Sequence, residues 1–195
     1  MEQATIIRII RIVLILLVLG LFIWFILWLF SPGKEPDVPT EQPIDTPTQV
    51  EQFDAVRYVQ DGQITAQEQH YSVQITIDSG SRRIDVMQGY NGNIIRSQSY
   101  SNTIASYDAF YAAINNVGFF VKRENANGAD RVGVCPFGIR YSYQAGSPIS
   151  ELSLDTWGSS CGTKTGTFGG NASQVKTLFK EQIPDYSTIT KDISL

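Results

Sequence analysis

The chain has 195 residues, of which 43% are hydrophobic and 17% are charged, and its formal net charge at pH 7 is −4. This acidic balance argues against nucleic acid as a partner, because binding to a phosphate backbone requires a basic face. Without its first fifty residues, the chain has the length of one domain that can bury its own core.

Residues 12–30 contain no charged residue and are almost entirely apolar. A helix of that length spans about 28 Å, close to the hydrocarbon thickness of a bilayer. A cleaved signal peptide is the alternative, but its apolar region is shorter and ends in small residues. Because this run ends in Leu-Trp-Leu-Phe, the sequence favours an uncleaved signal anchor that crosses the membrane.

The direction of the anchor follows from the charges beside it. Arg8 and Arg11 directly precede the apolar run, and basic residues remain on the cytoplasmic side of a membrane. We therefore expect residues 1–11 to be a short cytoplasmic tail of a single-pass cell-membrane protein, with everything after residue 30 outside. Residues 31–50 hold five of the eight prolines, which predicts a semi-rigid linker.

Residues 51–195 are expected to form the exported domain. Strict apolar and polar alternation over residues 71–78 predicts a half-buried strand. Shorter alternating stretches predict strands at 56–59, 83–86 and 94–100, with Asn91 and Gly92 turning the last hairpin. A second hairpin is expected from residues 138–143 and 152–157.

Two helices complete the predicted domain. The first covers residues 106–117, where Ser106 is expected to cap the helix and Gly118 to end it. The second covers residues 172–182 and ends before Pro184. The order of elements predicts an α+β fold with an antiparallel sheet and two helices packed on one face.

Cys135 and Cys161 flank the second predicted hairpin and are the only cysteines of the chain. An even number of cysteines on the oxidising side of a membrane favours a disulfide. Free thiols or a redox pair are the alternatives, although the close Cys-x-x-Cys spacing of exchange enzymes is missing.

Residues 158–162 match the Gly-x-Ser-x-Gly pattern of serine hydrolases, with Ser160 as the nucleophile. A helix should follow such an elbow directly, whereas Gly and Thr residues follow here. His70 is the only histidine, and its place near a strand start suggests a surface or edge residue. The same region lacks the second glycine of a phosphate-binding loop, and no metal-ligand spacing occurs. We therefore expect no catalytic residue, metal, nucleotide or other cofactor.

Aromatic residues gather near the two cysteines in the sequence. Core packing is one interpretation, and a surface that binds a sugar polymer or a protein is the other, because Tyr and Trp combine an apolar ring with a polar group. The candidates for such a surface are Tyr141, Tyr143 and Trp157.

The anchored layout, the Trp-Gly-Ser-Ser-Cys stretch at 157–161 and the Gln-Ile-Pro-Asp-Tyr stretch at 182–186 resemble uncharacterised envelope proteins of candidate-phylum bacteria. The resemblance implies a place in the cell envelope and no activity. The leading hypothesis is a membrane-tethered, non-enzymatic module that binds a protein or a cell-wall polymer. A small serine hydrolase using Ser160 and a disulfide-held protease inhibitor are the alternatives.

Overall fold

The computed structural model describes residues 17, 19–21, 52–123, 130–162 and 166–195. The chain divides into two units, Met1–Val50 and Glu51–Leu195. The described residues of the first unit, Leu17 and 19–21, are helical. No helix among the described residues is both long and apolar enough to cross a membrane. The predicted anchor otherwise lies outside the described residues, as do Arg8, Arg11 and the linker. The anchor, its direction and the linker therefore stay predictions.

The second unit is built on a six-stranded sheet in which every neighbouring pair is antiparallel. The strands are β1 (Ala55–Asp61), β2 (Tyr71–Asp78), β3 (Ser81–Gln88), β4 (Asn93–Ser101), β5 (Arg140–Gly146) and β6 (Leu152–Ser159). Their order across the sheet is β4-β3-β2-β1-β5-β6. The predicted antiparallel α+β fold is therefore confirmed.

Strand β1 joins the two predicted halves of the sheet. On one side it pairs with β2, with Ala55 opposite Asp78, and on the other with β5, with Ala55 opposite Gly146. The β3–β4 hairpin turns through Gly92, which has a φ of +68° that glycine adopts without strain. Two hairpins distant in sequence thus form one continuous surface.

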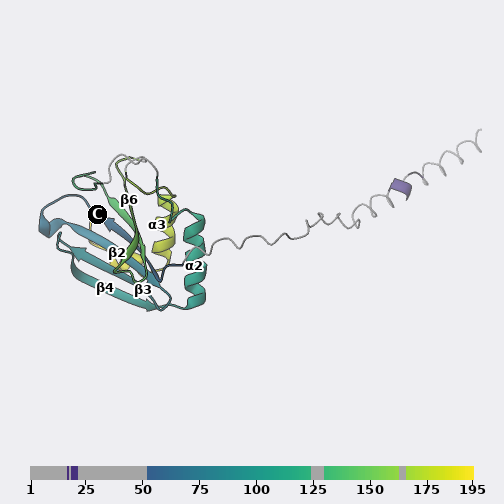
Figure 1. The fold of residues 1–195 in the computed structure, drawn as a ribbon, viewed down its shortest axis with the longest axis horizontal. Helices are drawn as coiled ribbons and strands as arrows, with labels where there is room; N and C mark the ends of the chain where they lie inside the picture. The colour runs from purple at the N-terminus through teal and green to yellow at the C-terminus, as the bar shows by residue number, and fades with distance from the viewer. Residues whose placement is uncertain (1–16, 18, 22–51, 124–129, 163–165) are drawn as a thin grey trace, which may run out of the picture. The chain divides into compact units, whose positions relative to one another are not determined.

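Helices α2 (Ile104–Asn116) and α3 (Ala172–Glu181) lie side by side against the sheet (Figure 1). They meet through the rings of Phe110 and Phe179, whose centroids are 5.1 Å apart. A 3-10 turn, η1 (Gln67–Gln69), precedes β2, and a short helix, α4 (Tyr186–Ile189), follows α3.

The start of α2 differs from the sequence expectation. Thr103 is the N-cap, and its hydroxyl accepts a hydrogen bond from the backbone N–H of Ser106. Ser106 therefore lies inside the first turn, where its hydroxyl accepts a hydrogen bond from Thr103. The helix ends as predicted, with Gly118 at a φ of +80° directly after the C-cap.

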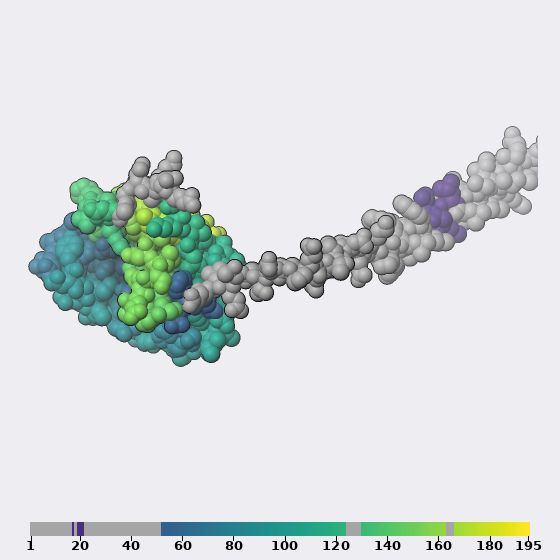
Figure 2. All heavy atoms as spheres, in the orientation of Figure 1, coloured from purple at the N-terminus to yellow at the C-terminus, as the bar shows by residue number. Residues whose placement is uncertain are grey.

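The core lies between the helices and one face of the sheet. Alternate residues of β1 and β2, such as Val56, Tyr58 and Ile75, are fully buried on this face. They pack with Ile114 and Phe179 of the helices. Figure 2 shows one outer face of the described residues with all heavy atoms drawn. The intervening residues of each strand project from the opposite face, which is mostly polar and bears the candidate site.

Candidate functional site

A groove of about 560 Å³ lies along the polar face of the sheet. Its floor comes from β1, β2, β5 and β6, and its sides come from the segments around Ile64, Tyr90 and Val132. We call it the sheet groove. It is lined by Arg57, Val59, Asp61, Ile64, Gln74, Tyr90, Arg131, Val132, Gly133, Arg140, Tyr141, Ser142, Gln144 and Trp157.

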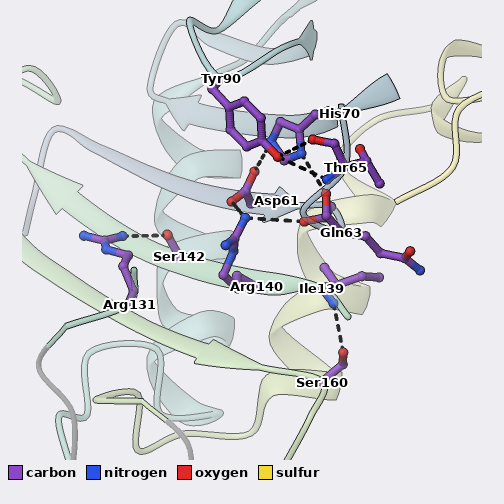
Figure 3. Close-up of polar contacts among 11 residues, drawn as sticks. Asp61, Gln63, Thr65, His70, Tyr90, Arg131, Ile139, Arg140, Ser142 and Ser160 are labelled. Carbon is purple, nitrogen blue, oxygen red and sulfur yellow. Dashed lines mark hydrogen bonds and ion pairs between the residues drawn. The ribbon is translucent and has the colours of Figure 1, made fainter. Parts of the chain in front are cut away.

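The lining of the sheet groove includes part of a charged cluster centred on Asp61 (Figure 3). Its carboxylate accepts hydrogen bonds from His70 Nε2 at 2.9 Å and from Arg140 Nη2 at 2.5 Å. The side chains of His70 and Arg140 are only 3% and 12% exposed, whereas that of Asp61 is 34% exposed. The cluster follows from the sheet register, because Asp61 of β1 is paired with Arg140 of β5.

His70 is a structural element of the groove wall. Its Nδ1 lies 2.9 Å from the carbonyl oxygen of Gln63, and its ring stacks on Tyr90 with centroids 4.2 Å apart. The sequence expectation of a surface or edge histidine is wrong, because Asp61 and Gln63 contact its two nitrogens while Tyr90 covers one face of its ring. The hydroxyl of Tyr90 donates to Thr65 O at 2.8 Å, so the orientation of the Tyr90 ring is also fixed.

The predicted bridge between Cys135 and Cys161 is confirmed, with Cα atoms 5.6 Å apart. It ties the segment before β5 to the end of β6. The same segment is fixed by hydrogen bonds from Ile64 N to Pro136 O at 2.8 Å and from Ile139 N to Ser160 Oγ at 2.9 Å. We call residues 130–138 the disulfide loop.

The disulfide loop exposes two large apolar side chains. Phe137 is 85% exposed and Val132 is 82% exposed. Tyr90 and Ile64, at the sides of the groove, are 51% and 40% exposed. Large apolar side chains that an anchored loop exposes to solvent are typical of a surface that contacts a partner or ligand.

Arginine side chains dominate the charge of the sheet groove. Arg131 reaches from the disulfide loop and donates to Ser142 Oγ at 3.0 Å and to the carboxylate of Asp155. Arg57 donates through Nε to Thr76 Oγ1 at 3.3 Å. Burial lowers the pKa of the Arg57 guanidinium, and this effect is partly offset by the nearby charge of Asp85. The groove is thus a cationic site on an acidic chain.

The three aromatic residues singled out in the sequence do not share one surface. Tyr143 is fully buried on the helix side, where it stacks on Phe168 at 3.7 Å, and burial raises the pKa of its hydroxyl. Tyr141 is half-buried and stacks on Tyr58 with centroids 6.2 Å apart. Trp157 is 3% exposed and lines the sheet groove.

Ser160 lies in a second hollow of about 750 Å³, between the ends of β5 and β6 and the start of α3. Its hydroxyl accepts the Ile139 N–H and lies 3.8 Å from Cys135 Sγ. The described contacts of His70 go to Asp61, Gln63 and Tyr90, and Figure 3 shows the His70 and Ser160 side chains apart. The structure therefore does not bring Ser160 together with the only histidine of the chain, the base that the alternative hydrolase hypothesis would need. Residues 163–165, which end the phosphate-loop-like stretch, lie outside the described residues.

Within the described ranges, no group of three or more His, Cys, Asp or Glu side chains is arranged to hold a metal ion. Comparison of the chain with protein-family models, with curated proteins and with solved structures found no match.

Proposed function

We propose that this chain is a membrane-tethered cell-envelope protein whose extracytoplasmic domain is a non-enzymatic binding module. The apolar run at residues 12–30 supports the tether, and Arg8 and Arg11 support an exported C-terminal domain. The disulfide between Cys135 and Cys161 supports the same location, because such bridges persist in oxidising compartments.

The sheet groove is the single observation that carries the binding proposal. A preformed groove of this volume, with a few fixed polar groups and an apolar rim, is the usual form of a ligand site. Its walls are anchored before a ligand arrives, on one side by the disulfide and on the other by the stack of His70 on Tyr90. Such pre-organisation reduces the ordering cost of binding.

Co-sedimentation of the purified full-length chain with insoluble cell-wall polymer tests this proposal. We expect the chain to sediment with the polymer, and we expect Val132→Ser, at an 82% exposed position of the groove lining, to lower the bound fraction at least fivefold. Ile104→Ser is the matched control, because Ile104 is 70% exposed at the start of α2, in the helix layer. Equal loss in both variants, or no binding by the parent chain, would contradict the proposal.

A protease inhibitor is the second candidate, favoured by the exposure of Phe137. A large apolar side chain on a disulfide-anchored loop has the form that a protease with an aromatic-binding pocket accepts. This candidate predicts stoichiometric inhibition of a chymotrypsin-like protease by the full-length chain and its loss in Phe137→Ala. Cleavage after Phe137 without inhibition would exclude it.

A further inference from the structure

Two hydrogen-bond donors of residues that line the sheet groove have no partner in the described part of the chain. The indole Nε1 of Trp157 and the Nε of Arg140 are buried and make no hydrogen bond among the described residues. Trp157 is 3% exposed, so this donor is held inside the protein at the groove wall. A buried donor without an acceptor costs free energy, and its presence in a groove points to an acceptor supplied by a ligand.

Arg57 adds a positive charge that has no direct ion pair among the described residues. In the part of the chain that the structure describes, no carboxylate lies within 4.0 Å of its guanidinium. The nearby carboxylate of Asp85 is already engaged, at 2.9 Å by Arg83 and at 2.6 Å by Ser97. The single hydrogen bond of Arg57, from Nε to Thr76, leaves its terminal nitrogens available to a ligand.

The carboxylates and the hydroxyl at the same site already accept hydrogen bonds from neighbouring side chains. Asp61 accepts from His70 and Arg140, and the hydroxyl of Ser142 accepts from Arg131. Asp155, which binds Arg131, also accepts from Gln144 at 3.3 Å. The groove therefore offers donors and positive charge, and the complementary ligand group is an oxyanion, which is acceptor-only and pairs with guanidinium groups.

The rim indicates what carries the oxyanion. Tyr90 uses one ring face to stack on His70, and its hydroxyl is tied to Thr65. Because the residue is still 51% exposed, a rigid aromatic face is presented to solvent beside the arginines. A flat apolar ring next to strong donors suits a sugar, whose ring has apolar C–H faces and polar substituents.

We propose that the sheet groove binds an acidic saccharide, with its carboxylate or phosphate held by Arg57 and its sugar ring against Tyr90. This inference rests on the proposed binding function and names the class of its ligand. A sugar carboxylate and a sugar phosphate both offer only hydrogen-bond acceptors. The experiment therefore compares an acidic sugar of each kind.

The intrinsic fluorescence of Trp157 reports ligand binding in this test. The chain has three tryptophans, so the full-length Trp24→Phe/Trp28→Phe variant in detergent micelles fluoresces from Trp157 alone. Glucuronate, glucose 6-phosphate, glucose and an Asp-Glu dipeptide are titrated at constant ionic strength. We expect a saturable change in Trp157 emission with at least one acidic sugar, and no change with glucose.

Substitutions in the Trp24→Phe/Trp28→Phe variant distinguish the effect on binding of a charge in the groove from that of a charge elsewhere. Arg57→Gln should weaken binding of the acidic sugar at least tenfold, and Arg57→Lys should weaken it severalfold, because lysine keeps the charge but loses the planar fork. Lys176→Gln, which removes a positive charge from α3, should leave the affinity unchanged. Near-UV circular dichroism confirms that each variant is folded.

Equal binding of glucose, equal or tighter binding of the dipeptide, or unchanged affinity in both Arg57 variants would overturn the inference. The proposed function fails separately, when the parent chain does not sediment with wall polymer. If the chain sediments and Val132→Ser does not, while Arg57→Gln binds normally, the binding module stands and its acidic-saccharide specificity is wrong.

Discussion

Reduction of the Cys135–Cys161 disulfide should destabilise the domain of residues 51–195 by about 3.5 kcal/mol. The bridge joins residues 26 positions apart, and the chain-entropy relation gives an entropy change of about 12 cal/mol/K for a loop of that length. At 25 °C this corresponds to about 3.5 kcal/mol, a large part of the stability of a typical domain. The bridge stabilises the folded domain mainly by reducing the conformational entropy of the unfolded chain.

Urea unfolding monitored by far-UV circular dichroism measures this loss. With a slope of about 2 kcal/mol/M for a domain of this size, the midpoint should fall by about 1.8 M on reduction. The Cys135→Ala/Cys161→Ala variant should match the reduced protein and should not respond to reductant. A change in the free energy of unfolding below about 1 kcal/mol would refute the reasoning and indicate that the unfolded chain already holds the two ends together.

Other predictions follow from the buried groups. Burial raises the pKa of Tyr58, so its contribution to stability is complete below pH 10 and is lost as the pH rises further. Tyr58→Phe should reduce the decline of the free energy of unfolding, measured in urea, by about 1.4 kcal/mol per pH unit, and an unchanged slope would argue against it. Asp61→Asn should cost about 2 kcal/mol in urea unfolding, because it leaves Arg140 buried without its carboxylate; in combination with Arg140→Gln the total should be smaller than the sum, and additivity would contradict the pairing. A serine-reactive fluorophosphonate should not label the chain; labelling that Ser160→Ala abolishes would favour the hydrolase.

The secondary structure was largely predictable because its signals are local. Alternation identified the strand at residues 71–78 with the bounds of β2, and periodic apolar residues identified α2. The disulfide followed from an even cysteine count and an exported location. The position of β1 between the two hairpins was not predictable, because strand pairing joins residues as distant as Ala55 and Gly146.

The candidate site was harder to predict for the same reason. His70 was misjudged because its environment depends on Asp61, Gln63 and Tyr90, whose positions around it are set by the folded sheet. Trp157 and Tyr143 were both candidates for one surface, but their side chains project from opposite faces of the sheet. The available signal was the polar alternate face of β1 and β5, which places Arg57, Asp61 and Arg140 on one side, but only the register shows that they share a groove.

Site-specific photocrosslinking in the native membrane tests the central claim most directly. A benzophenone amino acid replaces Val132 at the rim of the sheet groove or, as the control, Ile104 in the helix layer of the full-length chain. We predict that the Val132 position crosslinks to saccharide material outside the membrane, and that excess acidic sugar suppresses this product while the Ile104 position gives none. Equal crosslinking from both positions, or crosslinking from Ile104 alone, would contradict a ligand site in the sheet groove.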